Sequence, residues 1–146
     1  MNKGNLLIID DEPLLLKNLK INLEDYADTI FTASNGIEAL EVFKRESVHC
    51  IICDINMPQM NGVEVIKRVR EMGSHVPFIF YTGHRNPELM FEAVKYGAFD
   101  FLDKPHFEGL EEVIARGMKD GFSPSKQTSE DEMLSEYQKL LREVKE

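Results

Sequence analysis

The chain has 146 residues, and its 17 Lys and Arg against 26 Asp and Glu give a formal net charge of −9 at pH 7. This length fits one domain and excludes two large ones. The negative charge repels phosphate backbones, so direct nucleic-acid binding is not expected. No apolar run reaches the roughly 18 residues of a membrane helix, and we therefore expect a cytoplasmic protein without a membrane segment.

Short apolar strands alternate with amphipathic helices along residues 4–120. The helices are predicted from apolar residues that recur every three or four positions, as in Pro13–Glu24. Five strands, rich in β-branched and aromatic residues, are predicted at Asn5–Ile9, Thr29–Ala33, Val48–Cys53, Val76–Tyr81 and Phe99–Leu102. This alternation indicates a doubly wound α/β fold with five helices around a parallel sheet, flavodoxin-like in the strand order 2-1-3-4-5.

The composition changes after this α/β region. Residues 121–130 are rich in Ser, Pro, Lys, Gln and Thr, which predicts a linker between a domain at 1–120 and a short amphipathic helix at 131–146. The apolar seam of that helix is formed by Met133, Tyr137, Leu140 and Val144. Two heptads are too few for an independent coiled coil, so the helix either packs on its own domain or serves a dimer or partner contact.

Polar and charged residues follow the ends of four predicted strands. They are Asp10 and Asp11 after the first, Asp54 after the third, Thr82 after the fourth and Lys104 after the fifth. Because the carboxyl ends of parallel strands meet at one edge of the sheet, the three carboxylates converge if the first and third strands are neighbours. Such a cluster is costly without a cation, and Mg²⁺ fits best because it takes few carboxylates and keeps several waters.

A divalent cation, a lysine and a hydroxyl around one carboxylate suit phosphoryl transfer, in which a protein mainly positions groups and neutralises charge. The nucleophile in that chemistry would be Asp54, which would form an aspartyl-phosphate.

Separated motifs carry a resemblance to a known family. They are Asp10-Asp11, Asp54-Ile-Asn-Met-Pro-Gln-Met-Asn-Gly62, Tyr81-Thr82-Gly83 and Lys104-Pro105. With them, the chain resembles the receiver domain of two-component response regulators over residues 4–120. The resemblance implies that Asp54 accepts a phosphoryl group from a phosphohistidine of a sensor histidine kinase or phosphotransfer protein. It also implies a switch rather than an enzyme, with only its own phosphoryl acceptance and slow autodephosphorylation to catalyse.

The resemblance further implies how the site residues divide their work. Asp11 and Asp54 would ligate Mg²⁺ together with the main-chain carbonyl of Asn56, and Asp10 would act largely through water. Lys104 would contact the phosphoryl group, and its peptide bond to Pro105 is expected to be cis.

A switching mechanism comes with the same resemblance. Thr82 would swing to the phosphoryl oxygen and Phe101 would turn inward, which changes the face of the fourth helix, fifth strand and fifth helix where partners bind. Asn56 and His84 would face the attacking water, and we expect the lifetime of the phosphorylated state to depend on His84.

Each motif also has a simpler explanation when taken alone. Asp10 and Asp11 suit a helix N-terminus, and Asp54 suits an ordinary turn. Cys50 and Cys53 are spaced three apart, point to opposite faces of a strand and are expected to be core thiols. A haloacid-dehalogenase-type phosphohydrolase needs an aspartate where Asn56 stands. A flavodoxin-like flavin or nucleotide binder needs a glycine-rich loop after the first strand, where this chain has acids.

We expect a receiver that acts through protein contacts, either standing alone or as a fragment of a larger regulator or hybrid kinase. Its partners would be a kinase, a downstream protein target and, in one alternative, a second copy in a homodimer.

Overall fold

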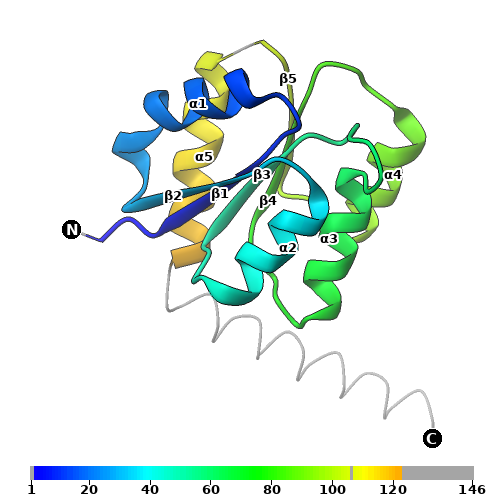
Figure 1. The fold of residues 1–146 in the computed structure, drawn as a ribbon, viewed down its shortest axis with the longest axis horizontal. Coiled ribbons are helices and arrows are strands. Elements are labelled where there is room, and N and C mark those ends of the chain that lie inside the picture. The colour runs from blue at the N-terminus through cyan, green and yellow to red at the C-terminus, as the bar shows by residue number, and fades with distance from the viewer. Residues whose placement is uncertain (1, 106, 123–146) are drawn as a thin grey trace, which may run out of the picture.

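The computed structural model describes residues 2–105 and 107–122, which form a sheet between two layers of helices (Figure 1). The five strands are parallel in the order β2-β1-β3-β4-β5, which confirms the predicted fold class. In chain order the elements are β1 (Asn5–Ile9), α1 (Pro13–Asn22), the 3-10 turn η1 (Glu24–Tyr26), β2 (Thr29–Ala33), α2 (Gly36–Arg45), β3 (Cys50–Cys53), α3 (Gly62–Glu71), β4 (Phe78–Thr82), α4 (Pro87–Lys95), β5 (Asp100–Asp103) and α5 (Phe107–Phe122).

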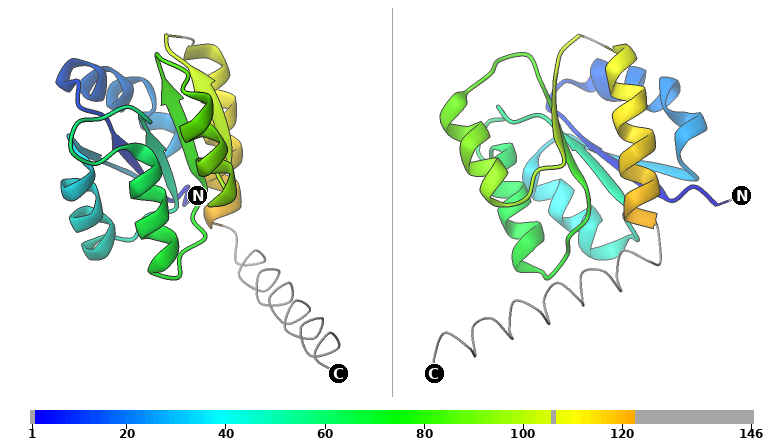
Figure 2. Two further views of the ribbon diagram at one scale, coloured as in Figure 1. Left: turned by 90° about the vertical axis from the view of Figure 1, so that its right-hand side faces the viewer. Right: turned by 180° about the vertical axis from the view of Figure 1, so that it is seen from behind.

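Helices cover both faces of the sheet (Figure 2). α1 and α5 pack on one face, and α2, α3 and α4 pack on the other. Because successive side chains of a strand alternate, Cys50 lies in the core under α1 and α5, and Cys53 lies in the core on the opposite face. Burial raises the pKa of the Cys53 thiol well above its usual range. Both cysteines are buried and neither forms a disulfide bond, as expected for core thiols.

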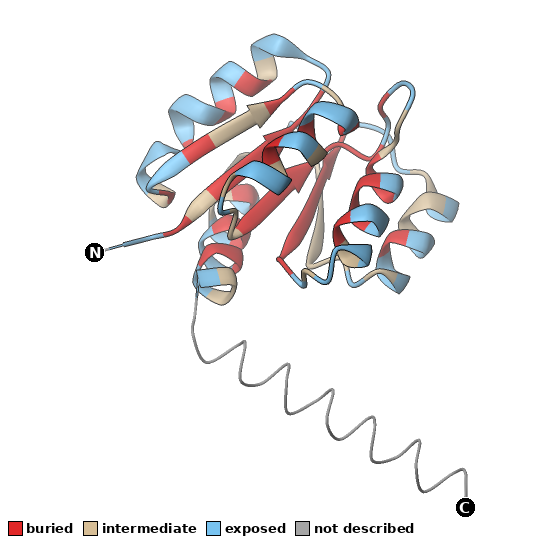
Figure 3. Ribbon diagram, turned by 60° about the horizontal axis from the view of Figure 1, so that its bottom comes forward, coloured by how far each residue is buried: buried red, intermediate tan, exposed pale blue. Residues whose placement is uncertain are grey.

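The centre of the sheet is buried and its two edge strands, β2 and β5, are less buried (Figure 3). Every residue of β3 and β4 is buried, whereas every residue of β5 is only half-buried. The helices beside these strands differ in the same way, because α3 buries five residues and α4 buries only Ala93. The β5 and α4 side of the domain is therefore held by less buried surface than the centre.

Two strands extend further toward the carboxyl edge than the sequence pattern predicts. β4 ends at Thr82 instead of Tyr81, and β5 ends at Asp103 instead of Leu102. Thr82 and Asp103 pair with each other across the two strands. A β-ladder is made of main-chain hydrogen bonds and does not stop at a polar side chain. It ends with the Lys104 N–H, which donates to the Thr82 carbonyl at 2.9 Å.

Other boundaries shift by a few residues. β3 begins at Cys50 instead of Val48, and β4 begins at Phe78 instead of Val76. α5 continues to Phe122, so Gly121 and Phe122 belong to a helix and not to the expected linker. The rest of that linker and the helix expected at 131–146 lie outside the described residues. Within the described ranges, no helix has the length and apolar character needed to cross a membrane.

Candidate functional site

Three aspartates meet at the carboxyl edge of the sheet, where β1 and β3 lie side by side. The pairing of Ile9 with Cys53 places Asp10 next to Asp54, and the Asp54 N–H donates to the Ile9 carbonyl at 3.1 Å. One carboxylate oxygen from each of Asp10, Asp11 and Asp54 lies within 4.8 Å of the other two. The convergence expected from the strand order is therefore confirmed.

The aspartates differ in their exposure to solvent. Asp10 and Asp54 are 2% and 7% exposed, whereas Asp11 is exposed. Burial raises the pKa of Asp10, and its hydrogen bond from Lys104 offsets only part of that shift. Asp11 thus offers its carboxylate from the solvent side of a cluster whose other two members are held inside the protein.

Lys104 brings its ammonium group into this acidic cluster. Its Nζ lies 2.7 Å from Asp10 Oδ2 and 3.1 Å from Asp54 Oδ2. Burial by itself lowers the pKa of Lys104, but hydrogen bonds and charges from both aspartates outweigh burial, and the pKa is raised. Three carboxylates against one ammonium leave two negative charges uncompensated when all are ionised. A hard divalent cation with oxygen ligands fits this donor set.

Thr82, also 2% exposed, lies at the end of β4 on the far side of Asp54 from β1. Its hydroxyl donates to the His84 carbonyl at 3.2 Å and accepts from Asn56 Nδ2 at 3.4 Å. The Asn56 amide also donates to the His84 carbonyl at 2.8 Å. The side chain of Asn56 therefore joins the loop after Asp54 to the loop after Thr82.

Phe101 and Pro105, both singled out from the sequence, flank the site on β5 and just beyond it. The Phe101 ring is half-buried and stacks on Phe80, with ring centroids 5.4 Å apart and planes inclined by 14°. The Lys104–Pro105 peptide bond is cis, as the resemblance implies.

A close approach of α3 to Asp54 was not foreseen from the sequence. A Cβ on Gly62 would lie 2.6 Å from the Asp54 carbonyl oxygen and 2.8 Å from the Phe80 ring, so only glycine fits there. Asn61 caps α3 by accepting from the Glu64 N–H at 3.0 Å. The Asn61-Gly62 pair reads as a turn in the sequence, and nothing in that signal shows the contact with Asp54.

The chain is similar in sequence to proteins of a known family. Residues 6–115 match the family described as the response regulator receiver domain. The chain is 35% identical over 102 residues to the transcriptional regulatory protein GlrR of Escherichia coli (strain K12), covering 70% of this chain and 23% of that protein. It is 32% identical over 103 residues to the transcriptional regulatory protein FixJ of Bradyrhizobium diazoefficiens, covering 70% of this chain and 50% of that protein.

The chain belongs to the response regulator receiver domain family. The crystal structure of the chemotaxis protein CheY4 of Vibrio cholerae matches it with a TM-score of 0.72 and 31% identity, over 78% of this chain and 98% of that one. Receiver domains are signalling switches that interact with sensor kinases and downstream effectors, and they bind Mg²⁺ in an acidic pocket. The chain spans half or less of the length of these two curated relatives.

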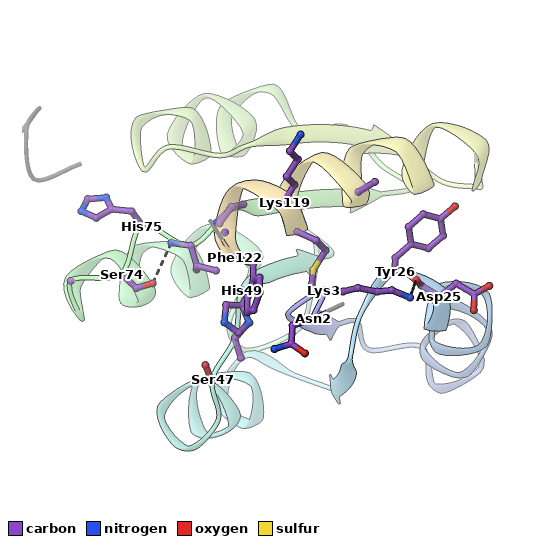
Figure 4. Close-up of a pocket in the computed structure, with 17 residues that line it drawn as sticks. Asn2, Lys3, Asp25, Tyr26, Ser47, His49, Ser74, His75, Lys119 and Phe122 are labelled. Atoms are coloured by element: carbon purple, nitrogen blue, oxygen red, sulfur yellow. Dashed lines mark hydrogen bonds between the residues drawn. The ribbon is translucent and has the colours of Figure 1, made fainter. Parts of the chain in front are cut away.

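A hollow lies at the opposite edge of the sheet from the acidic cluster, next to the residues that precede β1, β3 and β4 (Figure 4). Its volume is about 1140 Å³, and it is lined in part by Lys3, His49, His75 and Phe122. Among the described residues, Asp10, Asp11 and Asp54 form the only cluster of three potential metal ligands, and that cluster lies outside this hollow. A smaller hollow of about 720 Å³ lies at the carboxyl edge of the sheet, beside Asn56 and His84.

His49 has a structural role in the larger hollow. Its main-chain N–H donates to the Asn5 carbonyl, and its Nδ1 accepts from the Asn5 N–H, both at 2.8 Å. The ring packs edge-on against Phe122, with centroids 4.8 Å apart. Burial lowers the pKa of His49, and the charge of Asp28 opposes this shift only in part. The neutral imidazole is therefore the form that stabilises the fold.

We expect the stability of this domain to fall as the pH is lowered through the usual titration range of histidine, near pH 6.5. The unfolded chain protonates His49 first, so the stabilisation is complete above about pH 6.5 and declines until the pH reaches the lower folded-state pKa. His49→Asn keeps an acceptor for Asn5 and cannot titrate, so it should flatten this decline in urea unfolding. His75→Asn, which changes an exposed histidine of the same hollow, is the control and should not flatten the decline. Equal pH slopes for wild type and His49→Asn would contradict the assignment.

Proposed function

We propose that this chain is a phosphorylation-activated switch of a two-component system in which Asp54 accepts a phosphoryl group from a sensor kinase phosphohistidine. The observation that carries the proposal is the convergence of three carboxylates and the Lys104 ammonium at one sheet edge. A carboxylate held next to positive charge is a suitable acceptor, because phosphoryl transfer needs its reactants in line and its charge neutralised.

The acidic cluster would hold Mg²⁺ through Asp11, Asp54 and the main-chain carbonyl of Asn56, with Asp10 acting through a bound water. When bound, the ion neutralises charge on the phosphoryl oxygens. Asp11 fits a ligand role because its carboxylate is exposed and lies within the same 4.8 Å cluster. Asp10 fits a supporting role because Lys104 already occupies one of its oxygens at 2.7 Å.

Asp54 would attack phosphorus with a carboxylate oxygen while the histidine nitrogen of the donor leaves with the electron pair of the broken bond. The Asp54 carboxylate is oriented for this role, since its Oδ1 accepts from the Asn56 N–H at 3.2 Å. Lys104 Nζ lies 3.1 Å from the other oxygen and would follow the negative charge onto the transferred group.

Thr82 and Phe101 would relay the change to the partner-binding face. The Thr82 hydroxyl would leave the His84 carbonyl for a phosphoryl oxygen, and Phe101 would move in the space beside Phe80. The face made by α4, β5 and α5 would then change shape. It already presents apolar groups on α4, because Phe91 and Val94 are 65% and 59% exposed.

The domain organisation is part of the same proposal. A receiver whose last helix ends at Phe122, a linker from there to residue 130 and an amphipathic helix at 131–146 would give a switch that acts by protein contact, including contact with a second copy. GlrR and FixJ are transcriptional regulatory proteins, and the chain covers 23% and 50% of their length. A phosphohydrolase is disfavoured, because Asn56 cannot carry the proton that such an enzyme moves.

Incubation with Mg²⁺ and acetyl phosphate tests the acceptor role. We expect one phosphoryl group on the intact protein, lost in Asp54→Asn and on chelation of the metal, and kept in Asp25→Asn, which changes an exposed acid near the opposite edge. Intact-protein mass spectrometry measures each outcome. Phosphorylation that survives in Asp54→Asn would contradict the acceptor, and steady release of phosphate from many esters would favour a hydrolase.

The lifetime of the phosphorylated state should depend on the imidazole of His84. His84 contacts Asn56 and Thr82 through its main-chain N–H and carbonyl, so His84→Ala leaves these contacts in place. Without an imidazole to orient the attacking water, we expect phosphate to be lost several-fold more slowly. His75→Ala serves as the control, and an unchanged decay rate in His84→Ala would refute this role.

A further inference from the structure

The loop between β4 and α4 is fastened to β5 by an ion pair that the proposed reaction does not use. Arg85 Nε lies 2.7 Å from Asp103 Oδ1, and Arg85 Nη2 lies 2.9 Å from Asp103 Oδ2. Such a two-point contact fixes the guanidinium relative to the carboxylate far better than a single hydrogen bond. Asp103 ends β5 next to Lys104 and pairs in register with Thr82. The ion pair thus bridges the switch loop and the strand that carries the lysine.

The two ends of α4 are held in different ways. At its C-terminal end, Arg70 of α3 donates to the carbonyls of Tyr96 at 2.7 Å and Gly97 at 3.0 Å. The same guanidinium donates to the carbonyls of Ser74 and Val76, so that end of α4 is tied to the core of the domain. At the N-terminal end the loop is held by the exposed Arg85–Asp103 pair and by hydrogen bonds from Asn56 and Thr82 to the His84 carbonyl, and α4 buries only Ala93. Movement of α4 about its C-terminal end therefore costs least.

We propose that the Arg85–Asp103 ion pair is a latch that holds the β4–α4 loop in its resting position and opposes the phosphorylated arrangement. This inference rests on the proposed function, because the loop begins directly after Thr82 and carries His84 beside the phosphoryl site. The Thr82 hydroxyl reaches a phosphoryl oxygen only after it leaves the His84 carbonyl. The hollow of about 720 Å³ lined by Asn56, His84 and Arg85 leaves space for that rearrangement.

The strength of this latch suits a reversible switch. Arg85 and Asp103 side chains are 56% and 45% exposed, so their attraction is screened by water and salt. A pair of this kind shifts a two-state equilibrium by about two- to fivefold. A ligand that favours the phosphorylated arrangement must work against the latch, so it binds more tightly when the latch is removed.

The test uses the full chain with Mg²⁺ and beryllofluoride, an anion with the shape and charge of a phosphoryl group. The variants are Arg85→Gln, Asp103→Asn and the two combined. Arg116→Gln is the matched control, because it breaks another exposed pair on β5, Arg116 Nη2 to Asp100 Oδ2 at 3.4 Å, away from the β4–α4 loop. Calorimetry gives the dissociation constant of beryllofluoride, and hydrogen exchange of residues 83–90 without ligand gives the mobility of the loop.

The latch requires three results together. Each single variant should bind beryllofluoride about two- to fivefold more tightly, the double variant should gain no more than either single one, and loop exchange should rise in all three but not in Arg116→Gln. High salt should reduce the difference in beryllofluoride affinity between the variants and wild type. Unchanged affinity, weaker binding or additive effects would overturn the latch. Failure of wild type to bind beryllofluoride would instead contradict the proposed function, and loop exchange would still decide whether the pair restrains the loop.

Discussion

The contact of Lys104 with Asp10 and Asp54 is the constraint on which the rest of this structure depends. It holds two buried carboxylates of like charge beside each other, an arrangement that is unfavourable without a nearby cation. The lysine is supplied by the strand end furthest along the chain, so the ion pairs close only when β1, β3, β4 and β5 lie side by side in the order seen here. Among the described residues, the buried polar side chains are Asp10, Asp54 and Thr82, all at this edge.

Buried surface is distributed unevenly around this cluster. β3 and β4 are buried along their full length and position Asp54 and Thr82 with little freedom. On one side of them lie the half-buried β5 and the sparsely buried α4. If a charge were added at Asp54, the centre of the sheet would therefore move little, and the structural change would occur on the β5 and α4 side. The transition would be a change between two packed arrangements, not a gradual deformation.

Much of this arrangement could be predicted from the sequence, because it follows from periodicity and from the geometry of parallel sheets. Alternating strands and helices fix the fold class, and polar residues at strand ends must share one edge. Contacts made by single side chains across the fold could not be predicted in this way. The four carbonyls bound by Arg70, the pairing of Arg85 with Asp103 and the close approach of Gly62 to Asp54 depend on tertiary geometry. The strand ends at Thr82 and Asp103 were missed because main-chain pairing continues through polar residues.

The most direct test of this account is a Mg²⁺ titration of the unphosphorylated protein. If Asp10, Asp11 and Asp54 form one cation site, wild type should bind a single Mg²⁺ saturably. Asp54→Asn should weaken that binding by at least about tenfold, while Asp25→Asn should bind as wild type does. Equal Mg²⁺ affinity in wild type and Asp54→Asn, or no saturable binding at all, would show that these carboxylates do not act together and would remove the chemical basis of the switch.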